Sequence, residues 1–278
     1  MEIIRSLAEM QAWRRRVSTP VTFVPTMGAL HAGHVELLRQ AKTRLPDSAL
    51  VLSIFVNPLQ FGPTEDLARY PKPFEKDAEI ARTEKVDVLF APSPSEMYPA
   101  GFSTSVEESE LSRPLCGKFR PGHFKGVTTV VLKLFNLVRP TAAFFGLKDA
   151  QQFFVIKKMV KDLSLDIELI GVPTVREPDG LALSSRNAYL SPEERAKAPL
   201  LHAALNQVST DKETIDQAKA RLESNGFTVQ YIELLPLPEE KVSILAIAAY
   251  LGKTRLIDNL ISETAPPSTP GTNSYSSG

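Results

Sequence analysis

The sequence predicts an α/β protein in which a doubly wound parallel sheet is followed by a smaller α+β unit. Over the first two-thirds of the 278 residues, short apolar runs alternate with stretches that carry apolar residues at helical spacing. Such alternation is typical of a parallel sheet with helices on both faces. Beyond Arg186 the pattern changes to helical stretches followed by three closely spaced strand-like runs. We therefore expect a large unit over residues 1–185, a smaller α+β unit over 186–264, and a disordered tail over 265–278 that is rich in Pro, Ser, Thr and Gly.

The elements of the first unit are predicted from apolar runs and their spacing. Strands are expected at residues 21–25, 49–56, 86–90, 142–145 and 166–170. Helices are expected at residues 35–41, 74–85, 127–138 and 150–162, where apolar residues recur at helical intervals. Ligands of doubly wound sheets bind beyond the carboxyl ends of the strands. The residues that directly follow each strand are therefore the candidates for a functional site.

The second unit begins at a helix start. Ser191 is placed to cap the helix, Pro192 suits its first position, and Glu194 completes a capping box. Helices are expected at residues 193–206 and 212–224, the second of them ended by an Asn-Gly pair. Strands are expected at residues 229–234, 242–250 and 254–257.

Composition excludes several classes of protein. The 32 Lys and Arg residues balance 32 Asp and Glu residues, so the chain lacks the basic excess of a nucleic-acid binder. A single cysteine, Cys116, provides neither a disulfide framework nor a thiolate cluster for a metal, and it fits a reducing compartment. No apolar run is long enough for a signal peptide or a membrane span. We expect a soluble, cytoplasmic protein that binds neither membrane nor nucleic acid.

Residues 27–34 are the most informative segment of the chain. They place His31 and His34 three residues apart, between an expected strand and an expected helix. Gly28 and Gly33 allow the backbone to come close to a ligand. A helix N-terminus attracts phosphate, and histidines at positions i and i+3 share one helix face. We expect both rings to face one anionic group.

Other phosphate and metal motifs do not fit this segment. A P-loop requires lysine where His34 stands, and a second glycine pair with the same spacing, Gly117 and Gly122, is followed by His123. No Gly-x-Gly-x-x-Gly follows a strand, which excludes the dinucleotide fingerprint. The histidine pair also lacks the glutamate and the spacing of a zinc-peptidase helix, so no protein-bound metal is expected. The segment instead resembles the His-x-Gly-His loop of the nucleotidylyltransferase superfamily.

Polar residues follow two other expected strands. Asn57 and Gln60 come after the second strand, and their amides can both donate to and accept from a substrate that carries hydroxyl and carboxylate groups. After the strand at 142–145, Gly146 allows close approach and Lys148 offers a positive charge to phosphate. Asp149 can accept from ribose hydroxyls, and Gln152 falls about one helical turn later. An incidental turn and an exposed Lys-Asp pair are the alternatives for these two segments.

A third candidate lies in the loop at residues 175–187, where Ser184, Ser185 and Arg186 could form a mobile phosphate-binding loop. This Ser-Ser-Arg core resembles a degenerate form of the second ATP motif of class I aminoacyl-tRNA synthetases. A plain surface loop is the alternative. The basic, glycine-rich loop at 120–127 could contact phosphate, close over the site or simply cap a helix, and the sequence leaves this open.

Taken together, five motifs resemble those of the pantothenate synthetase (pantoate–β-alanine ligase) family, in the family order and up to about residue 262. They lie at residues 24–34, 53–61, 120–124, 145–152 and 179–187. The resemblance implies a Rossmann-like fold and a cytoplasmic homodimer that uses ATP with Mg²⁺. It also implies a two-step reaction in which ATP and pantoate give pantoyl-adenylate and pyrophosphate. The amine of β-alanine then displaces AMP to give pantothenate.

The resemblance also implies roles for individual residues. Catalytic roles are implied for His34, His31, Lys148, Ser184, Ser185 and Arg186, with His34 as the proton donor. ATP contacts are implied for Met27, Gly28, Ala29, Leu30, His31, Ala32, Gly33, His34, Gly146, Leu147, Lys148, Asp149, Val175, Leu183, Ser184, Ser185 and Arg186. Gln60 and Gln152 are expected to bind pantoate, and Gln60 also to bind β-alanine. Cys116 departs from the family pattern, since some relatives carry an acid there, and no role is assigned to it or to the tail.

Three other functions are alternatives to a pantoate–β-alanine ligase. A different nucleotidylyltransferase would share the histidine pair but not both the 57–60 and the 146–149 motifs. A tRNA synthetase would need an anticodon-binding domain and a basic surface, and the sequence has neither. A non-catalytic nucleotide-binding module would not need both phosphate-binding loops together with an amide-lined pocket.

Overall fold

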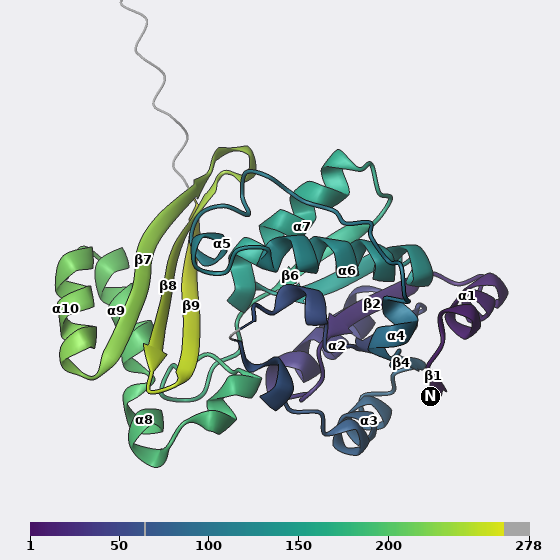
Figure 1. The fold of residues 1–278 in the computed structure, drawn as a ribbon, viewed down its shortest axis with the longest axis horizontal. Coiled ribbons are helices and arrows are strands. Elements are labelled where there is room, and N and C mark those ends of the chain that lie inside the picture. The colour runs from purple at the N-terminus through teal and green to yellow at the C-terminus, as the bar shows by residue number, and fades with distance from the viewer. Residues whose placement is uncertain (64, 264–278) are drawn as a thin grey trace, which may run out of the picture.

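The computed structural model describes residues 1–63 and 65–263, and over this part of the chain it contains two sheets that stand side by side (Figure 1). The larger is a six-stranded, wholly parallel sheet, which confirms the predicted fold class. Its strands are β1 (Glu2–Ile4), β2 (Val21–Thr26), β3 (Ala49–Ile54), β4 (Val88–Phe90), β5 (Ala142–Gly146) and β6 (Glu168–Val172). Its helices are α1 (Leu7–Arg16), α2 (Ala32–Arg44), α3 (Phe74–Thr83), α4 (Pro94–Met97), α5 (Cys116–Phe119), α6 (His123–Val138) and α7 (Ala150–Asp162).

The strand order β1-β4-β3-β2-β5-β6 positions the site. β2 pairs with β3 on one side and with β5 on the other, so the chain leaves β2 toward one edge of the sheet and later returns to its opposite side. Such a reversal opens a crevice beyond the carboxyl ends of the two central strands. The segments that follow β2 and β5 are residues 27–34 and 146–149, which belong to two of the five motifs noted in the sequence.

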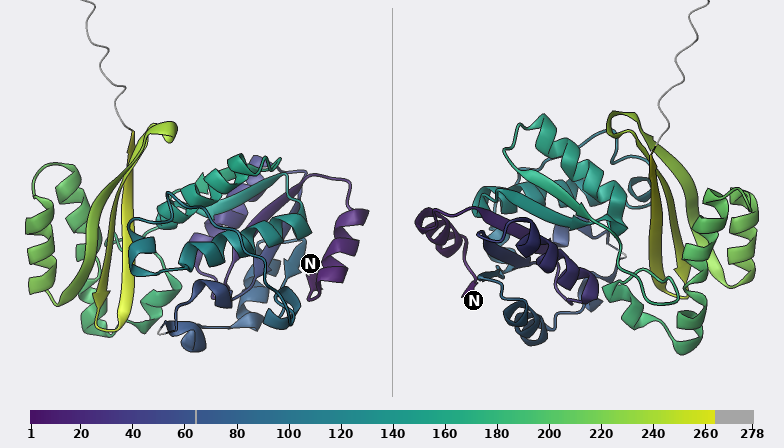
Figure 2. Two further views of the ribbon diagram at one scale, coloured as in Figure 1. Left: turned by 45° about the horizontal axis from the view of Figure 1, so that its top comes forward. Right: turned by 180° about the vertical axis from the view of Figure 1, so that it is seen from behind.

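Helices cover both faces of this sheet (Figure 2). Alternate residues of each strand point to opposite faces. On one face, apolar residues of α2 and α3 pack with Val24, Leu52 and Phe144. On the other, residues of α1, α6 and α7 pack with Phe23 and Val51. The sheet is therefore buried on both sides, as its continuous apolar runs indicate.

The second sheet is antiparallel and consists of β7 (Phe227–Leu237), β8 (Val242–Leu251) and β9 (Thr254–Glu263). Helices α9 (Leu200–Ser209) and α10 (Ile215–Ser224) cover its outer face, as Figure 2 shows. Ile244, Ala246 and Ala248 of β8 belong to the same apolar cluster as α6 and α7, whereas the alternate residues of β8 pack toward α9 and α10. The second sheet thus shares a core with the first. The boundary between residues 185 and 186 stays a prediction, and the proposed tail lies outside the described residues.

Several element boundaries differ from the predictions. The helix expected at 193–206 is two helices, α8 (Pro192–Lys197) and α9, because Pro199 interrupts the pattern. β1 and α1 were not predicted, since β1 has three residues and only Met10 and Trp13 of α1 are buried. β9 runs well beyond residue 257 because it pairs with β8 along its whole length. Within the described residues, no helix has both the length and the apolar character needed to cross a membrane.

One packing contact links the fold to the site and can be tested. Gly126 of α6 lies against the 3₁₀ helix Pro58–Gln60, and a Cβ atom there would stand 2.3 Å from the carbonyl oxygen of Leu59. We predict that Gly126→Ala lowers the free energy of unfolding by about 1–3 kcal/mol, because the backbone at Leu59 must move to make room for the methyl group. This cost exceeds the small gain from the higher helix propensity of alanine. Denaturant unfolding measures the change in free energy. Gly62→Ala is the control, since its Cβ would meet only the side chain of Glu65, at 3.6 Å. Equal stability of the Gly126→Ala variant and the wild type would contradict the prediction.

Candidate active site

A cavity of about 240 Å³ lies at the carboxyl edge of the parallel sheet. Of the predicted ATP-binding residues, it is lined by Met27, His31, Gly33, His34, Gly146, Lys148, Asp149, Val175, Leu183, Ser184, Ser185 and Arg186. Both predicted pantoate-binding residues, Gln60 and Gln152, line it as well. The fold therefore brings four separate segments of the chain to one volume, although the roles assigned to them stay predictions.

The remaining predicted ATP-binding residues do not line this cavity. They are Gly28, Ala29, Leu30, Ala32 and Leu147. Leu30 is buried in the core beneath the loop, and Ala32 lines a neighbouring groove between α2 and α3. A second cleft, of about 850 Å³, lies between the two sheets and shares Lys148 and Asp149 with the cavity.

His31 and His34 stand with ring centroids 4.1 Å apart at the start of α2. The Nδ1 atom of His31 accepts a hydrogen bond from the N–H of Gly33, at 3.2 Å, and Nδ1 of His34 accepts from the N–H of His31, at 3.3 Å. A nitrogen that accepts carries no proton, so in each neutral ring the proton is on Nε2. Each ring thus has a single N–H donor, and it is on the side away from the helix backbone.

Both rings are neutral at pH 7. Burial, together with the nearby positive charge of Lys148, lowers the pKa of His31 to about 4. Burial, together with His31 and Lys148 beside the ring, lowers the pKa of His34 to about 3. A neutral His34 presents its Nε2–H as a hydrogen-bond donor. Its expected role as the proton donor stays a prediction.

Several backbone N–H groups of the loop are hydrogen-bonded within the chain. Those of Ala29 and Leu30 donate to the carboxylate of Asp77, each at 2.8 Å, and that of Gly33 donates to His31. Asp77 is 1% exposed on α3, and burial raises its pKa. It holds a turn in which Gly28 has a φ of +83°, a conformation that favours glycine.

Asn57 is buried and orients Gln60 instead of lining the site with its own amide donors. Its amide nitrogen donates to the side-chain oxygen of Gln60, at 2.9 Å, and to the carbonyl of Gly126, at 3.1 Å. Its oxygen accepts from the hydroxyl of Tyr98, at 2.8 Å. Since the side-chain oxygen of Gln60 already accepts, its amide NH₂ is left for a ligand. That donor suits a carboxylate or hydroxyl oxygen.

The loop at 120–127, whose role the sequence left open, is bonded to the backbone of Gln60, and its residues Arg120 and His123 also line the cavity. Arg120 pairs with Glu65 and donates to the backbone carbonyl of Gln60, at 3.2 Å. His123 bonds the same carbonyl through Nδ1, at 2.8 Å, and its Nε2 accepts from Arg120. Burial, with the Arg120 charge beside it, lowers the pKa of His123 to about 4. Arg120 thus stabilises the pocket wall through bonds within the chain.

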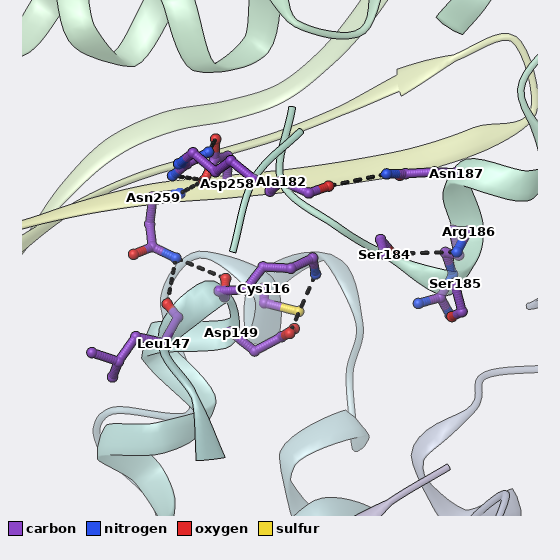
Figure 3. A network of polar contacts seen from close by, with 12 residues as sticks. Cys116, Leu147, Asp149, Ala182, Ser184, Ser185, Arg186, Asn187, Asp258 and Asn259 are labelled. Atoms are coloured by element: carbon purple, nitrogen blue, oxygen red, sulfur yellow. Dashed lines mark hydrogen bonds and ion pairs between the residues drawn. The ribbon is translucent and has the colours of Figure 1, made fainter. Parts of the chain in front are cut away.

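Lys148, Asp149 and the 184–186 loop complete the cavity. Lys148 lies 3.3 Å from Asp149, and although burial opposes ionisation, the charges of Lys148 and Arg186 hold the pKa of Asp149 below its usual value. Ser184 caps a 3₁₀ helix by accepting from the N–H of Arg186, and the Ser185 hydroxyl lies 3.3 Å from that of Tyr70. Figure 3 shows the three residues of this loop beside Ala182 and Asn187, which hold its base.

Several residues that shape the site are not among those predicted from the sequence. Asp77 could have been found, because it is an acid on the apolar face of α3, between Phe74, Ala78 and Ala81. Tyr98, and Asp258 and Asn259 of β9, give no such signal, since their hydrogen-bond partners are distant in sequence. Within residues 1–63 and 65–263, no group of three or more His, Cys, Asp or Glu side chains could hold a metal ion.

Comparisons with known proteins agree on one family. The family model of pantoate-beta-alanine ligases matches residues 2–261. A pantothenate synthetase from Thermotoga neapolitana is 48% identical over 94% of this chain and 99% of its own length, and one from Carboxydothermus hydrogenoformans is 49% identical over 94% and 97%. A solved pantothenate synthetase from Thermus thermophilus superposes with a TM-score of 0.84 at 44% identity, covering 94% of this chain and 99% of that one. The ligase from Francisella tularensis, complexed with β-γ ATP and β-alanine, gives 0.85 at 38% identity, covering 94% and 97%.

The lowered pKa values predict a loss of stability in mild acid. An unfolded histidine has a pKa near 6.5, whereas folded His31, His34 and His123 have values of about 4, 3 and 4. Between about pH 6.5 and 4 the unfolded chain binds more protons, so these groups lower the free energy of unfolding as the pH falls. The drop in melting temperature from pH 7.5 to pH 5.0 should be smaller in His123→Asn than in the wild type. Equal drops would show that His123 is not held neutral by the fold.

Proposed function

The chain belongs to the pantoate–β-alanine ligase family, and we propose that it forms pantothenate from pantoate, β-alanine and ATP through a pantoyl-adenylate. The observation that carries this proposal is the one cavity lined both by the amides of Gln60 and Gln152 and by Lys148, Arg186 and the two histidine rings. Amides without charge suit an acid that also carries hydroxyl groups. Cationic and N–H donors suit a triphosphate. The same cavity thus carries groups suited to both partners of an acid activation.

In the first step, a carboxylate oxygen of pantoate attacks the α-phosphorus of ATP. The bond from the α-phosphorus to the bridging oxygen breaks, and pyrophosphate leaves with the additional negative charge. Fixed donors aimed at that charge stabilise the transition state more than they stabilise the bound substrate, and this difference lowers the barrier. We assign this role to Nε2 of His31 and His34, to Lys148 and to the 184–186 loop. Gln60 and Gln152 hold the attacking carboxylate in place.

In the second step, the free amine of β-alanine attacks the carbonyl carbon of the adenylate. A C–N bond forms, the C–O bond to AMP breaks, and the amine loses a proton as the amide forms. The acyl group is already activated, so positioning supplies much of the remaining acceleration. Gln60 is assigned to β-alanine as well as to pantoate. No side chain is required as a covalent nucleophile.

The nucleotide is expected to lie across the ends of β2 and β5. We assign Val175 to the adenine, Asp149 to the ribose hydroxyls, and Met27 and Leu183 to the phosphates, with Gly146 allowing close approach. The N–H groups of Ala29, Leu30 and Gly33 have partners within the chain, so the contribution of their loop to phosphate binding comes chiefly from the two histidine rings.

ATP is proposed to enter as its Mg²⁺ complex. Mg²⁺ commonly keeps several waters and binds through substrate phosphates instead of a protein cage. Among the described residues that line the cavity, Asp149 is the one carboxylate, and it is paired with Lys148. We therefore assign the ion to the substrate. A cytoplasmic homodimer is retained as part of the proposal.

The order of events in the proposed reaction can be tested by isotope exchange. Given pantoate and Mg²⁺ without β-alanine, the enzyme should exchange labelled pyrophosphate into ATP, because the adenylate forms reversibly before the amine arrives. Gln60→Ala should lose exchange together with overall synthesis, since pantoate would be misplaced. Gln207→Ala, an exposed glutamine on α9, is the control and should keep both. Exchange that requires β-alanine would contradict a separate adenylate step.

The role of His34 predicts a ranking of variants. His34→Ala and His34→Asn should lower the rate of pyrophosphate release by about a hundred-fold, because both lack a donor at the Nε2 position. His34→Gln places an amide nitrogen near that position and should retain part of the rate. Circular dichroism establishes that each variant is folded. Near-normal turnover by a folded His34→Asn variant would refute the assignment.

A further inference from the structure

Two successive residues of β9 contact both segments that face the nucleotide site (Figure 3). The side-chain amide of Asn259 donates to the backbone carbonyls of Leu147, at 3.0 Å, and Lys148, at 2.7 Å. Both of its N–H donors are thereby used, and Asn259 is 8% exposed. The bonds cross from the small sheet to the 3₁₀ helix Leu147–Asp149, which carries Lys148 and Asp149 into the cavity.

Its neighbour Asp258 holds the other segment. The Asp258 carboxylate is 3% exposed and accepts from both terminal nitrogens of Arg176, at 2.6 and 2.9 Å, and from Nδ1 of His202, at 3.1 Å. Burial opposes its ionisation, but these partners hold the pKa of Asp258 below its usual value. Arg176 also donates to the carbonyl of Gly180 and pairs with Ala182 across the hairpin that precedes the 184–186 loop.

These contacts fix the distance between the two segments. The 147–149 helix follows β5 of the large sheet, whereas the 175–183 hairpin leads into the second unit. β9 is bonded to both through adjacent residues, and a strand paired along its whole length cannot slide without breaking its hydrogen bonds with β8. Two backbone carbonyls held by one amide also restrict the orientation of the Lys148–Asp149 peptide.

We propose that Asn259 is a positioning residue for the nucleotide. It holds the backbone of Leu147 and Lys148 so that the Lys148 side chain meets the phosphates, with β9 fixed by the Asp258–Arg176 pair. Asn259 lines the 850 Å³ cleft between the sheets and not the 240 Å³ cavity, its amide is used by the two carbonyls, and it is not assigned to touch substrate. The proposal rests on the proposed use of ATP, and it assigns to the small sheet a part in ATP recognition.

The test is substrate-specific kinetics of two variants. Asn259→Ala removes both donors and should lower kcat/KM for ATP by about ten-fold, as expected for the loss of two hydrogen bonds from an ordered loop. Asn259→Asp keeps the shape but turns an oxygen toward two carbonyl oxygens, so its loss should be at least as large. KM for pantoate should change less than two-fold in both. Should Asn259→Ala not fold, Asn259→Ser carries the same expectation, since its side chain is too short to bridge both carbonyls.

The matched control is Asn225→Ala. Asn225 also donates its amide to a backbone carbonyl, that of Arg221 at 2.9 Å, but it does so at the end of α10. Its variant should lose thermal stability and keep kcat/KM for ATP. Wild-type kinetics in Asn259→Asp, or an equal loss for ATP and pantoate, would overturn the proposal. Calorimetric binding of a non-hydrolysable ATP analogue to the wild type and to Asn259→Asp tests the positioning role of Asn259 without turnover. Absence of turnover in the wild type would therefore refute only the proposed function.

Discussion

The parallel pairing of β2 with both β3 and β5 is the constraint on which the site depends. Because parallel strands end at the same edge, the segments that follow them must meet there, whatever their separation in sequence. The reversal of strand order at β2 keeps the crevice open, because the helices that leave β2 and enter β5 cover opposite faces. Residues 27–34, 57–60, 146–149 and 173–175 are brought together by this topology alone. The cavity is therefore a consequence of the backbone path, and side chains determine only its chemistry.

Inside the crevice, hydrogen bonds within the chain determine which atom of each polar side chain remains for a ligand. His31 and His34 use Nδ1 internally, and Gln60 uses its side-chain oxygen, so each presents an N–H group. An unpaired polar atom is costly at low dielectric, which favours a single orientation for each group. Donors fixed before the substrate arrives need no reorganisation during the reaction. Asp77 and Asn57 contribute by holding these groups, and neither offers an N–H group of its own to substrate.

The small antiparallel sheet is part of this support. One face of β8 belongs to the core of the large sheet, and the adjacent residues Asp258 and Asn259 of β9 are bonded to both nucleotide-side segments. A change in the small sheet can therefore reach the site through this shared core and these bonds. The division into units at residue 185 describes the order of elements along the chain, whereas the packing joins them.

The sequence by itself determined the alternation of strands and helices, the parallel sheet and the segments that meet at its edge, because apolar periodicity and loop composition are local properties. It also placed twelve of the seventeen residues predicted to bind ATP on the cavity wall. It could not determine that Asp77 accepts from the N–H groups of Ala29 and Leu30, or that the Asn57 amide donates to Gln60 and Gly126. It gave no sign of Asn259. Those assignments depend on partners tens of residues distant, and only the packing of helices and of the second sheet decides which of several possible hydrogen bonds each side chain makes.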